Sequence, residues 1–150
     1  MNDIKTKVWE GEIPVHYLYT FGIAGEKFFR AIKERGVFTS SRCESCDVTY
    51  LPPRTYCERC MAELTEQKDA GSKGVVGTFT ICHEAQDGSR LKEPQILAQV
   101  TIDGSDGSII HRLSGVTADA VKIGMKVEAV FAEPSKRSGG IGDILHFRPV

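Results

Sequence analysis

Four cysteines arranged as two pairs place the strongest constraint on how this chain folds. Cys43 and Cys46 form one Cys-x-x-Cys pair and Cys57 and Cys60 form the other, with ten residues between the pairs. Each pair fits a tight turn that points both sulfurs the same way, so four thiolates can meet on one tetrahedral ion. The spacing therefore predicts a metal site with Cys43, Cys46, Cys57 and Cys60 as its ligands.

Sulfur fills every ligand position of this site, whereas catalytic zinc keeps one position open for water. We therefore expect a structural zinc ion that stabilises the fold, and we assign no catalytic residue. Two disulfides are the less favoured alternative, because nothing else in the sequence is typical of a secreted protein. A four-cysteine iron centre uses similar ligands, and the spacing alone leaves zinc and iron both open.

The balance of charge argues against a polyanion as the partner. The 150 residues carry a net charge of −1, with acidic and basic side chains interspersed. Residues 1–7 contain no apolar run of signal-peptide length. No segment approaches the roughly 18 consecutive apolar residues that indicate a membrane helix. These features predict a soluble, cytoplasmic protein that binds no membrane.

The N-terminal segment, residues 1–20, has no helical period but is rich in apolar and aromatic side chains. These are Val8, Trp9, Ile13, Val15, Tyr17, Leu18 and Tyr19. An extended arm of this length is too short for a core of its own. It is therefore expected to lie against the rest of the chain or against the surface of a partner.

A helix is predicted over residues 21–35, because its apolar residues recur at helical spacing and Gly36 supplies a C-terminal stop. The apolar positions are Phe21, Ala24, Phe28, Ala31 and Ile32. Residues 37–70 then form the metal-held ribbon, whose small size leaves it dependent on the ion. Structural zinc supplies on the order of 10–16 kcal/mol, so removal of the metal should unfold the ribbon first.

From Gly71 onward the sequence changes character, since eleven of the 15 glycines lie there and separate short β-branched segments. The expected strands are 75–82, 97–102, 109–113, 127–131 and 144–147, with a short helical turn at 118–121 between the third and fourth. This order is typical of an OB-fold barrel. Alternation predicts the core residues Val75, Phe79, Ile81, Ala98, Val100, Ile102, Val127, Ala129 and Phe131. Two long polar loops, 83–94 and 133–143, are expected between strands.

The sequence thus predicts a mainly β protein in three parts: an extended arm and helix over 1–36, a rubredoxin-like zinc ribbon over 37–70, and a five-stranded OB-fold barrel over 71–150. Beyond the four cysteines, several motifs recur in this order: Phe28-Phe29, Gly36, Tyr50-Leu-Pro-Pro-Arg54, Gly74-x-Val76, Ile123-Gly-Met-Lys-Val127 and Phe147-Arg-Pro149. With these motifs, residues 21–150 resemble a family that joins a rubredoxin-like zinc ribbon to an OB-fold and accompanies thiolase-superfamily acyl-CoA enzymes.

The resemblance implies a non-catalytic accessory subunit of an acyl-CoA acyltransferase (thiolase) complex. Family members are found with archaeal acetoacetyl-CoA thiolase, with steroid side-chain aldolases and with thiolases of anaerobic aromatic degradation such as benzoylsuccinyl-CoA thiolase. The aromatic arm of this chain is similar to that of the last group. The resemblance carries the zinc ligands over to the four cysteines, and a heterotetramer or larger assembly is expected. CoA or acyl-CoA would then be shared with the partner. Arg90 and Lys92 are candidate contacts for the CoA phosphates, although a solvated loop is the favoured interpretation of these two residues.

Two alternatives remain from other classes. Zinc ribbons and OB-folds also bind single-stranded nucleic acid, but that function needs aromatic platforms in a positive groove. Here the barrel half holds only Phe79, Phe131 and Phe147 as aromatic residues, and two of them are expected in the core. An enzyme built on Cys82 and His83 is disfavoured, because neighbouring strand residues point to opposite faces.

Overall fold

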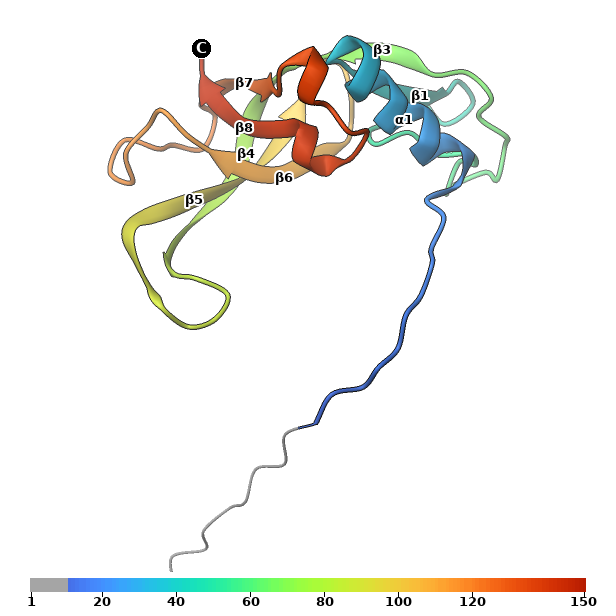
Figure 1. Ribbon diagram of the computed structural model, residues 1–150. Helices are drawn as coiled ribbons and strands as arrows, with labels where there is room; N and C mark the ends of the chain where they lie inside the picture. The colour runs from blue at the N-terminus through green and yellow to red at the C-terminus, as the bar shows by residue number, and fades with distance from the viewer. Residues whose placement is uncertain (1–10) are drawn as a thin grey trace, which may run out of the picture.

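The computed structural model describes residues 11–150, which form one helix, a small three-stranded sheet and a closed β-barrel (Figure 1). Residues 11–21 precede the helix as an extended arm that runs away from the body of the molecule (Figure 1). Val8 and Trp9, two of the apolar residues predicted for the arm, lie outside the described part of the chain. Within residues 11–150, no helix is long and apolar enough to cross a membrane.

The single helix, α1 (Gly22–Arg35), confirms the predicted helix almost to the residue. Its inward face buries Phe28, Ala31 and Ile32. Gly36 ends it in the left-handed conformation, with φ 64°, and its N–H donates to the carbonyl oxygen of Ile32 at 3.0 Å. Only glycine adopts that conformation at little cost. Phe21 differs from the expectation, since it precedes the helix and stays largely exposed, with its ring against Phe29.

The ribbon sheet has the strand order β2-β1-β3, with β1 at Phe38–Cys43, β2 at Val48–Tyr50 and β3 at Lys68–Gly71. Both pairings with β1 are antiparallel. Strand β1 ends at Cys43, so the sheet delivers the chain directly into the first cysteine pair.

The barrel closes in the order β4-β5-β6-β8-β7 and confirms the five predicted strands. Their bounds are β4 Lys73–Glu84, β5 Arg90–Ile102, β6 Ser108–Leu113, β7 Lys126–Phe131 and β8 Ile144–Pro149. All pairings are antiparallel except that between β6 and β8, which joins Leu113 to Phe147 in parallel and closes the barrel.

Three sequence expectations for the barrel half differ in detail from the structure. Val76, not Val75, is the fully buried residue of β4, because a register shift between Val76 and Thr78 changes the face that points inward. The predicted loop 83–94 is mostly strand, since β4 and β5 continue as a long hairpin that projects from the barrel (Figure 1). The predicted loop 133–143 contains two 3-10 turns, Pro134–Lys136 and Ile141–Asp143. The predicted helical turn at 118–121 is confirmed, since the N–H of Val121 donates to the carbonyl oxygen of Thr117 at 3.1 Å.

One hydrophobic core joins helix, ribbon and barrel. Phe38, at the start of β1, is fully buried between Phe28 of the helix and Phe131 and Phe147 of the barrel, with ring centroids 5.2–6.3 Å apart. The cysteines share a second, smaller cluster with Val48 and Tyr50. The metal end of the ribbon therefore has little apolar packing of its own.

Candidate metal centre

The two cysteine pairs occupy matching turns. Cys43 and Cys46 flank the turn after β1, and Cys57 and Cys60 flank a turn in which the N–H of Met61 donates to the carbonyl oxygen of Cys57 at 2.9 Å. The residue after each pair, Asp47 or Met61, has a left-handed backbone, with φ 52° and 60°. Residues other than glycine rarely adopt this backbone conformation. Its presence after both pairs shows that the two turns have the same form.

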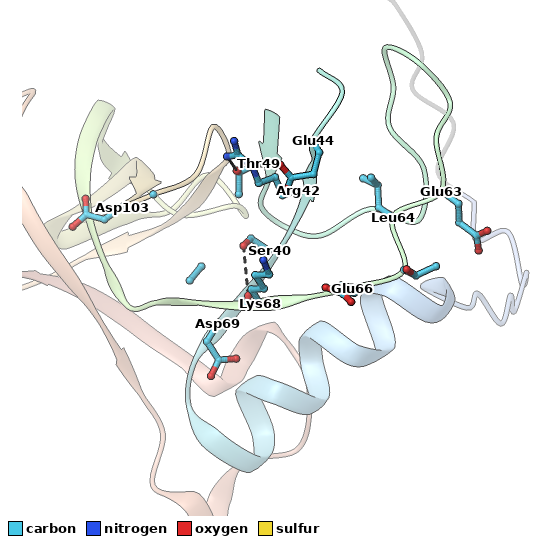
Figure 2. Close-up of a pocket in the computed structure, with 13 residues that line it drawn as sticks. Ser40, Arg42, Glu44, Thr49, Glu63, Leu64, Glu66, Lys68, Asp69 and Asp103 are labelled. Atoms are coloured by element: carbon cyan, nitrogen blue, oxygen red, sulfur yellow. Dashed lines mark hydrogen bonds and ion pairs between the residues drawn. The ribbon is translucent and has the colours of Figure 1, made fainter. Parts of the chain in front are cut away.

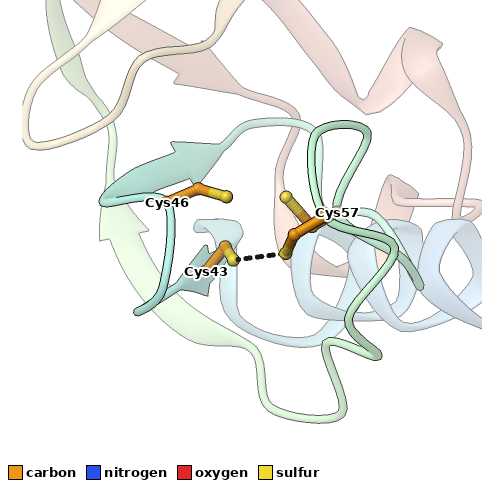
Figure 3. A group of neighbouring side chains, drawn as sticks. Cys43, Cys46 and Cys57 are labelled. Atoms are coloured by element: carbon orange, nitrogen blue, oxygen red, sulfur yellow. Dashed lines mark hydrogen bonds between the residues drawn. The ribbon is translucent and has the colours of Figure 1, made fainter.

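The four sulfurs lie within 4.8 Å of one another. Figure 3 shows the side chains of Cys43, Cys46 and Cys57 directed toward a common point. Cys43 Sγ lies 3.5 Å from Cys60 Sγ. Zinc–sulfur bonds of about 2.3 Å in a tetrahedron place neighbouring sulfurs about 3.8 Å apart, so the arrangement fits this ion. The four cysteines form a zinc-ribbon site.

Tyr50 is the principal contact of this site from outside the ligand set. Its hydroxyl lies 3.3 Å from Cys57 Sγ, and the N–H of Arg59 donates to the same sulfur at 3.4 Å. The hydroxyl contact, helped by backbone donors, lowers the pKa of Cys57 to about 6. The hydrogen bond with Cys60 instead raises the pKa of Cys46 to about 12. One thiolate forms readily, whereas four this close together need a cation.

The ribbon is fixed to the barrel at the loop between β5 and β6. The N–H of Asp106 donates to the carbonyl oxygen of Thr49 at 2.9 Å, and the N–H of Thr49 donates to Asp106 Oδ2 at 2.8 Å. Next to this pair, Gly107 packs directly on the backbone of Leu51. The Asp106-Gly107 dipeptide is typical of a tight turn, but no local pattern indicates its partner on the ribbon.

A polar cavity of about 450 Å³ lies beside the ribbon sheet, bounded by β1, β3 and residues 63–66 (Figure 2). Its lining is mainly charged. The cationic Arg42 pairs with Glu44 and Asp47, and Asp69 pairs with Arg35. These charges satisfy one another, and we assign no ligand to the cavity.

The remaining candidate residues lie apart from the cysteines. Arg90 and Lys92 are exposed at the outer end of the long hairpin. Cys82 is half-buried on β4 and His83 beside it is exposed. Phe79 and Phe131 pack partly buried against the main core, as expected, so neither offers a free stacking surface to a nucleic acid base.

The apolar side chains of the arm are exposed. Those within the described residues are Ile13, Val15, Tyr17, Leu18 and Tyr19, and the exposed surface continues through Phe21 and Ile23 at the start of α1. Of the two alternatives for the arm, packing on its own domain is therefore not observed for residues 11–20.

The zinc ribbon and the barrel each match a known protein domain. The family model of the ChsH2 rubredoxin-like zinc ribbon domain matches residues 30–64, and that of the ChsH2 C-terminal OB-fold domain matches residues 67–132. A DUF35 domain-containing scaffold protein of Pyrococcus furiosus is 28% identical over 105 residues, which are 69% of this chain and 75% of that protein.

Two solved structures share the fold. A protein of unknown function from the DUF35 family of Sulfolobus solfataricus has a TM-score of 0.66 and 23% identity, covering 86% of this chain and 87% of its own. The Ltp2-ChsH2(DUF35) aldolase has a TM-score of 0.61 and 22% identity, covering 82% and 91%. The resemblance seen in the motifs is thereby confirmed: this chain joins a zinc ribbon and an OB-fold that both match the domain models of the ChsH2 family.

Proposed function

We propose that this chain is the non-catalytic accessory subunit of a thiolase-type acyl-CoA enzyme, acting in the cytoplasm in a heterotetramer or larger complex. The observation that carries the proposal is the arm, whose apolar side chains extend into solvent next to a rigid module. Contiguous exposed apolar segments of this kind are typical of protein-interaction sites. The family supports the same role, since one relative is a scaffold protein and another structure is an aldolase that contains ChsH2.

In this proposal Cys43, Cys46, Cys57 and Cys60 hold a structural zinc ion. The ion fixes the outer end of the ribbon, which has only the small cluster around Val48 and Tyr50 for packing. Metal analysis of the protein purified from its own cells tests this step. One equivalent of zinc is expected, and a red protein with one equivalent of iron would contradict it.

The long β4–β5 hairpin is the element proposed to reach the acyl-CoA entrance of the partner. It projects from the barrel (Figure 1) and carries Arg90 and Lys92 at its exposed end. Cationic side chains there suit the phosphates of CoA, so the cofactor would contact both subunits. Closure over the entrance would exclude water and change turnover without adding a catalytic group. An aromatic acyl-CoA is the proposed substrate class, because the arm resembles that of the family members found with thiolases of anaerobic aromatic degradation.

Purification of the tagged chain from its own cells, with and without nuclease, tests the proposed function. A thiolase-like enzyme in near-equal amount is expected by mass spectrometry, and its activity should fall when this chain is removed. Nucleic acid or ribosomal proteins that disappear with nuclease would instead favour the binding-module alternative. Recovery with an unrelated enzyme would contradict the acyl-CoA part of the proposal.

The docking role of the arm is tested by deletion of residues 1–20, with deletion of residues 1–10 as the matched control. The larger deletion removes the exposed apolar segment and leaves the packed core intact. We expect it to abolish the complex while zinc content and circular dichroism stay unchanged. A complex and a turnover that both survive this deletion would show that the docking surface lies elsewhere.

A further inference from the structure

The arm has the side-chain pattern of a β-strand without the pairing of one. Ile13, Val15, Tyr17 and Tyr19 occur at every second position. Alternate residues of an extended chain point to the same face. The rings of Tyr17 and Tyr19 lie side by side, with centroids 5.8 Å apart. One face of the arm is therefore continuously apolar, although the arm carries no strand partner in the described structure.

The backbone of the arm is equally open. Its one backbone hydrogen bond among the described residues is local, from the N–H of Val15 to the carbonyl oxygen of Ile13 at 2.8 Å. Ten extended residues reach at most about 35 Å, and the arm runs away from the body of the molecule (Figure 1). Unpaired backbone groups are a template for another strand.

We propose that residues 13–19 add as a β-strand to an open sheet edge of the partner enzyme, with the four odd-numbered side chains on a shared apolar face. The identity of the partner rests on the proposed function, whereas the mode of docking rests on the arm itself. Strand addition satisfies the free backbone groups and lets alternate pockets recognise the side chains.

The size of the contact suits a protein partner. A buried aromatic side chain covers about 150–250 Å², so Ile13, Val15, Tyr17 and Tyr19 together bury on the order of 600 Å². A stable interface takes about 800 Å² from each partner. The arm supplies most of this area, and Phe21 and Ile23 extend it onto α1.

A helical docking mode makes a different prediction from the same residues. A helix would gather Val15, Leu18 and Tyr19 on one face and turn Tyr17 away. A strand instead places Tyr17 on the buried face and Leu18 on the other. Either side chain can be replaced without disturbing the folded core, since Tyr17 is 68% exposed and Leu18 104% exposed in the chain alone.

Pro14 fixes which backbone groups meet the partner. Proline has no N–H, so on an added strand it must lie where the N–H would point to solvent. Even-numbered residues then face away from the shared edge, and proline should also be accepted at position 16. A helix over the same segment would be broken by proline there.

The test measures binding of full-length variants to the enzyme that copurifies with the wild type. We expect Tyr17→Ser to weaken the complex tenfold or more, and the matched change Leu18→Ser less than threefold. His16→Pro should bind within threefold of wild type. Equal losses for Tyr17→Ser and Leu18→Ser, or loss of binding in His16→Pro, would overturn strand addition. Zinc content and circular dichroism establish that each variant is folded.

Hydrogen exchange gives an independent readout, since strand addition should protect the amides of residues 15, 17 and 19 more than those of 16 and 18. If the copurifying enzyme does not act on acyl-CoA but the arm bound to it shows this alternation of protected amides, strand addition stands and the proposed function is wrong. A chain that purifies alone as a monomer, or pairs its arm with a second copy, would overturn the proposed partner.

Discussion

The junction between ribbon and barrel makes the sharpest stability prediction. A methyl group at Gly107 would overlap the carbonyl oxygen of Leu51 and lie 2.5 Å from its nitrogen and 2.7 Å from its carbonyl carbon. These are backbone atoms of a residue that is itself buried, so no side-chain rotation relieves the contact. Gly107→Ala must therefore push the ribbon away from the barrel.

The expected cost follows from the contacts that this shift disturbs. Overpacking of a tight site typically costs about 1–3 kcal/mol. A shift also stretches the two hydrogen bonds between Thr49 and Asp106, each worth about 1 kcal/mol. Gly107→Ala should lower the free energy of unfolding by about 2–4 kcal/mol.

Urea denaturation followed by circular dichroism measures this loss. Gly142→Ala is the matched control, because a methyl group there meets nothing within 4 Å. Zinc release, read with a chromogenic chelator, should begin at lower urea in Gly107→Ala if the ribbon loosens first. Equal stability of the two alanine variants would refute the account of the junction.

Three further changes probe the metal end and the barrel loop. Removal of the metal with a chelator should expose residues 43–64 to hydrogen exchange before the barrel, because Phe38 stays in the main core; simultaneous exposure would contradict this. Tyr50→Phe removes the hydroxyl contact that lowers the pKa of Cys57, so protons compete better with the ion and zinc should be released at a higher pH than from wild type; an unchanged release midpoint would show that the hydroxyl is unimportant. Asp143→Asn should cost about 1–3 kcal/mol at pH 7, measured by urea denaturation, because the carboxylate accepts hydrogen bonds from the N–H groups of Ser138 and Gly139. Burial opposes ionisation of Asp143, but these donors hold its pKa below the ordinary value, so the stability that it adds is present above about pH 4 and disappears on further acidification; curves that fail to converge at low pH would refute this.

Local patterns in the sequence were sufficient for the elements of the fold. The helix, the five barrel strands and the cysteine turns each depend on near neighbours, through periodicity, a glycine stop or a two-residue spacing. The inward face of β4 was missed because a β-bulge moves it from Val75 to Val76, and alternation assumes an unbroken strand. The long hairpin was predicted to be a loop because its residues are mostly polar, although the two strands continue and Glu84 pairs with Arg90 across them.

What the sequence by itself determined is therefore the fold class, the two close cysteine pairs of the zinc-ribbon site and the resemblance to the ChsH2 domains, since the pairs and the strands follow local rules. Only the tertiary structure decided how these parts work together. The Tyr50 hydroxyl contacts Cys57, and Thr49 is hydrogen-bonded to Asp106. The ring of Phe38 packs between the helix and the barrel. These contacts join residues that chain closure brings together, and no local spacing encodes them. The structure also showed that residues 11–20 of the arm are exposed and do not pack on their own domain, which no local pattern could decide because burial is a property of the folded surface.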